Sequence, residues 1–154
     1  MAACFYFDTS ALVKQYISEM GTAWVQTTVA NQEVVIAEIG IVEMAAALSK
    51  RKRAGDLDQE TYADFLEAFL QDAETKYRTL ALDRDTLNLA VDLTRRHPLR
   101  AYDAVQLATA LRLAEVLAEE GLALTFVSAD AALCAAAAQE HLAAVNPNLL
   151  PETP

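Results

Sequence analysis

Two acidic residues directly follow short apolar runs rich in β-branched or aromatic residues. Asp8 comes after CFYF, and Asp130 comes after LALTFVSA. If both runs are strands of a parallel sheet, both carboxylates lie at its carboxyl edge, where open α/β sheets bind ligands. Asp is also a common helix N-cap or turn residue, so each position alone has a purely structural alternative.

A third acid, Glu43, lies within the apolar helical pattern IGIVEMAAAL. Its neighbours one helical turn away are Ile39, Gly40, Ala46 and Ala47, and none of them can pair with a carboxylate. Burying an unpaired carboxylate costs on the order of several kcal/mol or raises its pKa, which favours a nearby cation. The alternative is that Glu43 lies on the solvated edge of its helix.

The fourth acid, Asp103, stands in LRAYDAVQLATALRLA, near the start of a helical pattern that continues almost wholly apolar. Arg100, three residues earlier, offers an ion-pair partner. An exposed pair of this kind contributes only about 0.3 to 0.5 kcal/mol, so it would not by itself explain the acid. The ion pair remains the structural alternative for this position.

Together these acids predict a particular chemistry. Four carboxylates can share one pocket only if a divalent cation offsets their repulsion, and hard oxygen ligands favour Mg²⁺ or Mn²⁺. Such an ion orients and acidifies a water molecule and neutralises charge that develops on a phosphodiester under attack. We therefore expect metal-dependent phosphodiester hydrolysis, although spacing this long cannot show that the four residues converge.

Short apolar segments alternate with helical patterns along the chain. Strands are expected over residues 4–7, 33–37, 77–82 and 122–129. Helices are expected over residues 10–17, 22–31, 38–54, 59–76, 84–97 and 101–120, with a last one after Asp130; Asp58 and Asp83 are candidate N-caps. Because parallel strands need a crossover of helical length, this order predicts an α/β fold with helices on both faces of the sheet.

No linker, repeat or composition change divides the 154 residues, so one domain over 1–154 is expected. The proline-rich end, from about residue 146 to 154, is expected to be an irregular tail. The sequence has neither a run of roughly 20 apolar residues, which a membrane span needs, nor a secretion signal at its start. This predicts a soluble, cytoplasmic protein. Two cysteines are too few for a disulfide framework or a cysteine-based zinc site.

The formal net charge of −10 argues against a protein that binds nucleic acid through a broad basic face. Any such role must rest on a local site. Basic residues gather in two patches, residues 50–53 and 95–100. Solvated helix ends are the structural alternative for both patches.

Four segments, taken in order, resemble PIN domains. FYFDTSALVKQY is similar to the opening of that family, in which an apolar strand ends in Asp, followed by Thr or Ser and then by Ser or Ala, and runs into Leu-Val-Lys. IVEMAAALSKR, LRAYDAVQLATAL and FVSADAALCAAA resemble its second, third and fourth acidic segments. The resemblance implies a three-layer fold with a central parallel sheet of four or five strands, and RNA cleavage that depends on Mg²⁺ or Mn²⁺. It also implies that Asp8, Glu43 and Asp103 are the core metal ligands and that Asp130 completes the site.

Side chains near these acids are secondary candidates. Ser128 stands where the family often has Thr or Ser, and Thr9 and Ser10 are expected to orient Asp8. Turn capping is the alternative for these hydroxyls. The candidate contacts to RNA are Lys14, Lys50, Arg51, Arg53 and Arg100.

A stand-alone PIN domain of this length resembles the VapC-like toxins of toxin–antitoxin pairs. That resemblance implies a homodimer and a cognate VapB-like antitoxin whose C-terminal segment lies over the active site. An antitoxin Arg or Lys among the carboxylates would compete with the metal ion.

Two other functions remain open. Haloacid-dehalogenase-like phosphatases also begin with an apolar strand that ends in Asp, which would make Asp8 a phosphoryl-accepting nucleophile. However, Ser10 stands where those enzymes usually have a second Asp. A non-catalytic PIN-fold module that binds protein would fit the acidic charge, but the intact set of four acids argues against it.

Overall fold

The computed structural model describes residues 3–150 and contains one sheet of five parallel strands in the order β3-β2-β1-β4-β5. The strands are β1 (Cys4–Phe7), β2 (Glu33–Ala37), β3 (Arg78–Leu80), β4 (Leu124–Val127) and β5 (Ala143–Val145). All four neighbouring pairs are parallel. The four expected strands are therefore confirmed, and β5 is a fifth that the sequence patterns had not located.

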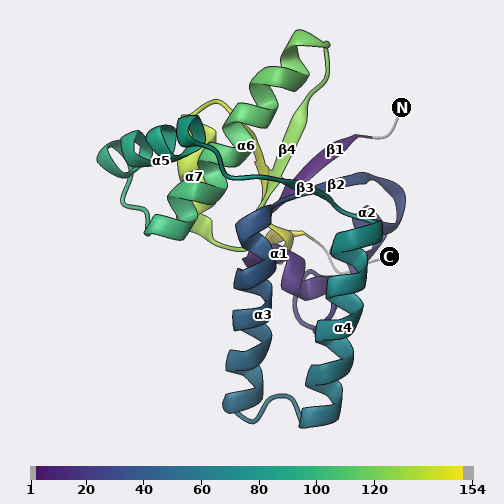
Figure 1. The fold of residues 1–154 in the computed structure, drawn as a ribbon. Helices are drawn as coiled ribbons and strands as arrows, with labels where there is room; N and C mark the ends of the chain where they lie inside the picture. Colours follow the sequence, from purple (N-terminus) through teal and green to yellow (C-terminus); the bar gives the residue numbers. More distant parts are fainter. Residues whose placement is uncertain (1–2, 151–154) are drawn as a thin grey trace.

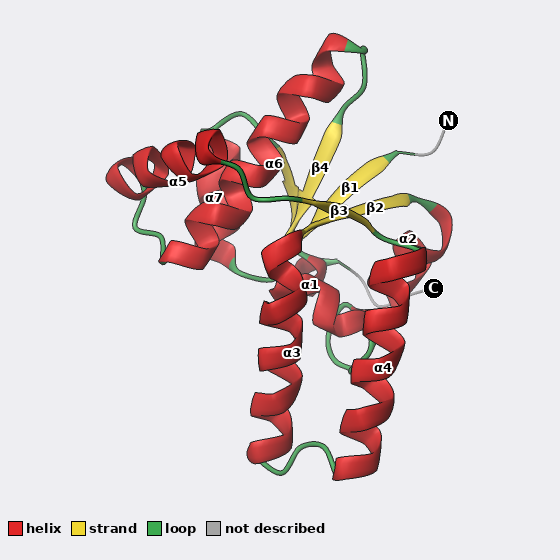
Figure 2. Cartoon of the chain, in the orientation of Figure 1, coloured by secondary structure: helices red, strands yellow, loops and turns green. Residues whose placement is uncertain are grey.

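Helices cover both faces of this sheet (Figures 1 and 2). They are α1 (Thr9–Leu12), α2 (Thr22–Asn31), α3 (Glu38–Arg53), α4 (Gln59–Thr75), α5 (Arg84–Arg96), α6 (Ala101–Glu119) and α7 (Ala131–Gln139), with 3-10 turns η1 (Val13–Gln15) and η2 (Pro147–Leu149). The three-layer α/β architecture is as predicted. Among the described residues, no helix has the length and apolar character that crossing a bilayer requires.

Alternation along the strands sends successive side chains into two separate cores. Tyr6 and Phe126 stack, at 5.7 Å between ring centroids, within the core that α5, α6 and α7 cover. Phe7 and Val127, the next residue on each strand, belong to the core beneath α1 to α4. The ends of β1 and β4 are therefore fixed from both faces.

Local signals set most helix boundaries. The carboxylates of Asp58 and Asp83 accept hydrogen bonds from the amides of Thr61 (2.7 Å) and Thr86 (2.8 Å), which confirms both as N-caps. The helix expected over residues 10–17 is instead the short α1, continued by the 3-10 turn η1. Tightening of this kind is common where a helix ends.

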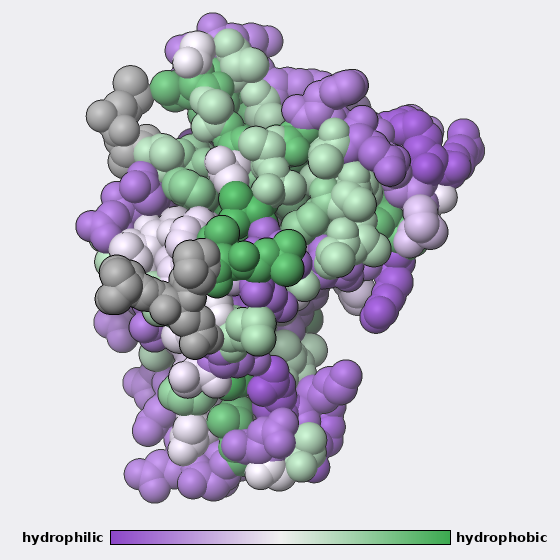
Figure 3. Space-filling view, turned by 180° about the vertical axis from the view of Figure 1, so that it is seen from behind, coloured by the Kyte–Doolittle hydropathy of each residue, from purple (hydrophilic) through white to green (hydrophobic). Residues whose placement is uncertain are grey.

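Helices α3 and α4 form a hairpin that extends away from the sheet (Figure 1). Its connection turns at Gly55, whose φ of 87° is the left-handed conformation that glycine adopts without strain. Seen from behind, hydrophilic residues dominate this hairpin end of the molecule (Figure 3).

The segment expected to be an irregular tail is ordered at its start. η2 lies within it, and Pro147 is buried against Gly21, where an added Cβ would come within 2.8 Å of the proline. Residues 151–154 of the expected tail lie outside the described residues.

Candidate active site

The strand order reverses between β1 and β4, because the chain leaves β1 toward β2 and β3, whereas it leaves β4 toward β5. Ligands of open α/β sheets bind at the carboxyl edge at such a reversal. Asp8 directly follows β1, and its amide donates to the carbonyl of Val127 at the end of β4 (3.0 Å). Asp130 lies three residues after Val127, so the structure brings Asp8 and Asp130 to the same edge of the sheet.

Asp8 is the most enclosed of the four acids, with only 5% of its surface exposed. Its Oδ1 accepts from the Ser10 hydroxyl (2.7 Å) and the Ala11 amide (3.2 Å), and its Oδ2 accepts from the Ser128 hydroxyl (2.8 Å). Burial raises the pKa of Asp8 to about 6, although these hydrogen bonds partly oppose the increase. Asp8 therefore caps α1 and is also a buried carboxylate that is costly to ionise.

Two serines join the ends of β1 and β4 through Asp8. Ser128 is fully buried, and its oxygen also accepts from the amide of Asp130 (3.1 Å). The Ser10 oxygen accepts from the amide of Ala129 (2.9 Å). Ser10 and Ser128 thus have the orienting contacts to Asp8 that the sequence predicted.

Glu43 lies in the second turn of α3 and is half-buried. Its Oε1 accepts from Gln106 Nε2 (3.2 Å), and its Oε2 accepts from the Thr9 hydroxyl (3.1 Å). The expectation that Thr9 orients Asp8 is wrong, because Thr9 is the first residue of α1 and its hydroxyl is directed at α3. Burial, followed by the charge of Asp103, raises the pKa of Glu43.

Asp103 is half-buried in the first turn of α6. Burial and then the charge of Asp130 raise its pKa, and its own charge raises the pKa of Asp8 and of Glu43. Arg100 lowers the pKa of Asp103, but no salt bridge joins the two within residues 3–150. Asp103 is therefore the acid whose charge interacts with each of the other three.

Asp130 has the structural role that the sequence left open. It is the N-cap of α7, and its Oδ1 accepts from the amides of Ala132 (2.9 Å) and Leu133 (3.1 Å). A cap with one oxygen leaves the other available, so capping and metal binding are compatible.

The donor chemistry of this cluster fits a hard divalent cation, because it offers carboxylate oxygens, and the salt bridges within residues 3–150 include none to Asp8. The four acids are spaced more widely than the ligands of a formed metal site. Among the described residues, no three His, Cys, Asp or Glu side chains are grouped closely enough to hold an ion. Like charges oppose a closer approach, so shared coordination requires some side-chain movement.

The candidate RNA-binding residues lie in different surroundings. Lys14 is only 3% exposed, and its Nζ donates to Glu19 (3.0 Å), so its ammonium is already paired and little of it is accessible to a phosphate. Arg51 binds the other oxygen of Glu19 (2.8 Å). Lys50 and Arg53 are exposed near the far end of α3, and Arg100 is exposed at the start of α6.

Two side chains of the site were missed by the sequence analysis. Gln106 contacts Glu43, as described above, and accepts a hydrogen bond from the Tyr6 hydroxyl. The signal for Gln106 was present, because it is a polar residue in the apolar run AVQLATAL, one helical turn after Asp103. Tyr6 gave no such signal, since tyrosine is ordinary in a buried strand.

Comparison with solved structures relates this architecture to known proteins. FitAcB from Neisseria gonorrhoeae superposes with a TM-score of 0.63 at 17% identity, over 95% of this chain and 99% of that one. A toxin–antitoxin complex from Klebsiella pneumoniae gives 0.58 at 19% identity, over 92% and 96% of the two chains. VapC20 from Mycobacterium tuberculosis, described as a sarcin–ricin loop cleaving toxin, gives 0.60 at 17% identity, over 86% and 94%.

The fold is that of the PIN domain. The likeness extends over most of the chain in each comparison. Neither the family models nor the curated proteins compared with the sequence match it. At these identities the likeness concerns the fold alone.

Proposed function

We propose that the protein is an endoribonuclease that depends on Mg²⁺ or Mn²⁺ and acts in the cytoplasm as the toxin of a toxin–antitoxin pair. The observation that carries this proposal is the buried Asp8 carboxylate at the carboxyl edge of β1, within electrostatic range of Asp103. A carboxylate held there at an energetic cost is typical of a functional site, because a purely structural position would tolerate a neutral residue.

The structural neighbours support the same function. VapC20 is described as a sarcin–ricin loop cleaving toxin, and the Klebsiella protein was solved as a toxin–antitoxin complex. These descriptions apply to those proteins. The PIN fold and the acids at its carboxyl edge make the same chemistry the best proposal for this chain.

In the proposed mechanism, Asp8, Glu43, Asp103 and Asp130 would hold the metal. A bound divalent ion supplies a water of lowered pKa and neutralises charge that develops on the phosphodiester. Ser10 and Ser128 fix the carboxylate of Asp8 from both of its oxygens. Arg100, exposed at the start of α6, would contact the RNA phosphate beside the site.

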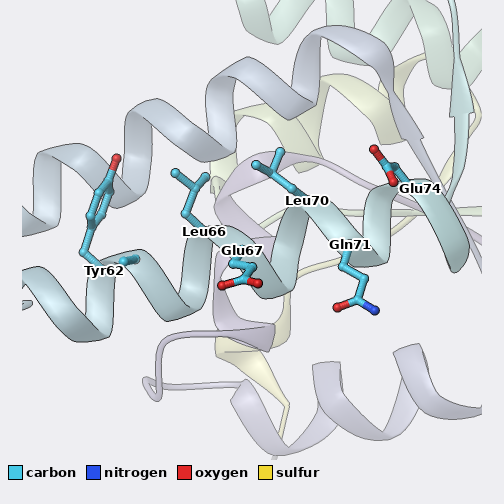
Figure 4. A pocket seen from close by; sticks show the side chains of 7 residues that line it. Tyr62, Leu66, Glu67, Leu70, Gln71 and Glu74 are labelled. Carbon is cyan, nitrogen blue, oxygen red and sulfur yellow. The ribbon is translucent and has the colours of Figure 1, made fainter.

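Two surfaces are candidates for partner binding. Val42 and Tyr102, 67% and 57% exposed, line a pocket beside Glu43 and are candidates for a homodimer contact. A second candidate surface, for an antitoxin, is a groove of about 530 Å³ along α4. Figure 4 shows Tyr62, Leu66 and Leu70 on one side of α4 there, with Glu67 and Gln71 on the other.

The test is cleavage of a mixed cellular RNA pool with Mn²⁺, with Mg²⁺ and with chelator. Metal-dependent cleavage that is lost in Asp8→Asn and Asp103→Asn is expected. Asp58→Asn is the matched control, because it makes the same acid-to-amide change at an exposed N-cap of α4. Absence of cleavage in every condition, from protein shown to be free of antitoxin, would refute the proposal.

The second candidate is a non-catalytic PIN-fold module that binds protein. It is favoured by the loose spacing of the acids, since among the described residues no three are close enough to hold an ion. Titration with Mn²⁺ separates the two functions. A module of this kind would bind no metal, and Asp8→Asn would leave its partner binding unchanged.

A further inference from the structure

A line of buried polar side chains connects β1 to α3 through α6. Tyr6 is fully buried on β1 and Gln106 is 2% exposed on α6. The hydroxyl of Tyr6 donates to Gln106 Oε1, and Gln106 Nε2 donates to Glu43 Oε1 at 3.2 Å. Buried polar groups are costly unless they are paired, and here both ends of the Gln106 amide are paired.

The direction of these hydrogen bonds fixes how the amide is oriented. A phenol held by burial in its protonated form donates its single hydrogen, and that hydrogen is directed at the amide oxygen. The amide nitrogen is then left facing Glu43. A flipped amide would instead place its carbonyl oxygen against the carboxylate, which is repulsive, so Tyr6 sets which end of Gln106 meets the acid.

Glu43 is fixed at both of its oxygens as a result. Gln106 on α6 donates to Oε1, while the hydroxyl of Thr9 on α1 donates to Oε2 at a distance of 3.1 Å. Each carboxylate oxygen keeps a further lone pair for another ligand. Gln106 also lies one helical turn after Asp103, so the same part of α6 carries one acid of the site and orients another.

We propose that Gln106, oriented by Tyr6, is a positioning residue that holds the carboxylate of Glu43 in the direction needed to bind the divalent cation. The inference rests on the proposed metal-dependent function and adds two residues to it. Gln106 acts through Glu43 and touches neither metal nor RNA. Partners of this kind typically change metal affinity by about 10- to 100-fold when they are removed.

The test measures Mn²⁺ affinity by calorimetry, without RNA, on the full-length protein. Gln106→Met keeps the length of the side chain and removes both hydrogen bonds, so at least a 10-fold weaker affinity is expected. Tyr6→Phe keeps the ring and removes only the hydroxyl, which reaches Glu43 through the amide of Gln106. A smaller loss of affinity is expected, because the amide is still present but is then free to flip. Gln139→Met, the same change at an exposed position at the end of α7, should leave the affinity unchanged.

A double-mutant cycle with Glu43→Gln distinguishes positioning from general structural damage. If Gln106 acts through Glu43, Gln106→Met causes no further loss of Mn²⁺ affinity once Glu43 is changed. An equal loss in both backgrounds would overturn the proposal, as would unchanged affinity in Gln106→Met. Should Gln106→Met fail to fold in chelator, the isosteric Tyr6→Phe variant takes its place in the same cycle. If the unmodified protein binds no Mn²⁺, the proposed metal-dependent function is refuted and this role with it.

Discussion

Replacing Asp8 with Asn should make the metal-free protein more stable, even though it removes a residue of the proposed site. Burial raises the pKa of Asp8 from 3.8 to about 6, so the ionised carboxylate is disfavoured in the folded state. Asn retains the size and shape of the side chain. Its oxygen can accept from Ser10 while its amide donates to the hydroxyl of Ser128.

The size of the effect follows from the pKa of Asp8. Each pH unit of difference between the folded and unfolded pKa is worth about 1.4 kcal/mol, which gives roughly 3 kcal/mol here. Between pH 4 and 6 the folded state binds a proton that the unfolded state has lost, so the free energy of unfolding falls as pH rises. Above about pH 7 the full penalty is present, and below about pH 4 it is absent.

Urea unfolding in chelator, followed by circular dichroism at pH 4, 6 and 8, measures this directly. We expect the free energy of unfolding of Asp8→Asn to exceed that of the unmodified protein by up to about 3 kcal/mol at pH 8 and by almost nothing at pH 4. Asp58→Asn is the control with the opposite sign. Hydrogen bonds from Thr61 lower the pKa of the exposed Asp58, so its loss should remove a little stability at pH 8.

Two results would refute this reasoning. One is an Asp8→Asn protein that is less stable than the unmodified one at pH 8. The other is a difference between the two that does not change with pH. Adding Mn²⁺ gives a further check, because a ligand at 100 times its Kd stabilises the folded state by about 2.7 kcal/mol. That gain should appear in the unmodified protein and be reduced in Asp8→Asn.

Three other predictions concern a contact of Asp8, an ion pair at the end of α7 and two basic residues near the end of α3. Ser128→Ala leaves a buried oxygen of Asp8 without its donor, so it should cost about 1 to 3 kcal/mol in urea unfolding and weaken Mn²⁺ binding; unchanged values for both would contradict the contacts described. Glu140→Gln should cost up to about 1 kcal/mol at pH 7, because hydrogen bonds from Arg96 lower the pKa of Glu140, and this cost should disappear as the pH falls through that lowered pKa; a loss that persists in acid would argue for packing instead. Changing Lys50 and Arg53 together to Glu should weaken RNA binding and reduce its salt dependence while Mn²⁺ affinity is retained. Filter binding at several salt concentrations measures both quantities, and unchanged values would contradict the prediction.

The sequence was informative wherever structure depends on neighbours along the chain. The runs CFYF and EVVIA became β1 and β2 with the expected bounds, since both are short, apolar and rich in β-branched or aromatic residues. Asp58 and Asp83 cap the helices predicted to follow them, because an N-cap needs only the next three amides. β5, the segment AAV, is short and alanine-rich, and its pairing with β4 is what makes it a strand.

The position of two of the candidate acids was predictable from the sequence, and the hydrogen-bond partners of the candidate residues were less so. Asp8 and Asp130 could be placed at one edge because that edge follows from the parallel order of the strands. The partner of Thr9 depends on how α1 packs against α3, which no local pattern contains. The burial of Lys14 depends in the same way on the loop that carries Glu19.

The contact between Asp8 and Ser128 also has a consequence for the time at which the protein becomes active. The two residues are 120 positions apart in the chain, and both belong to the same side of the proposed site. At roughly 5 to 20 residues per second, a ribosome needs about 6 to 24 seconds to synthesise that interval. During those seconds a nascent chain carries Asp8 without the strand that completes its surroundings. A nuclease of the proposed kind would therefore remain inactive beside the messenger that encodes it until β4 and Ser128 have been synthesised.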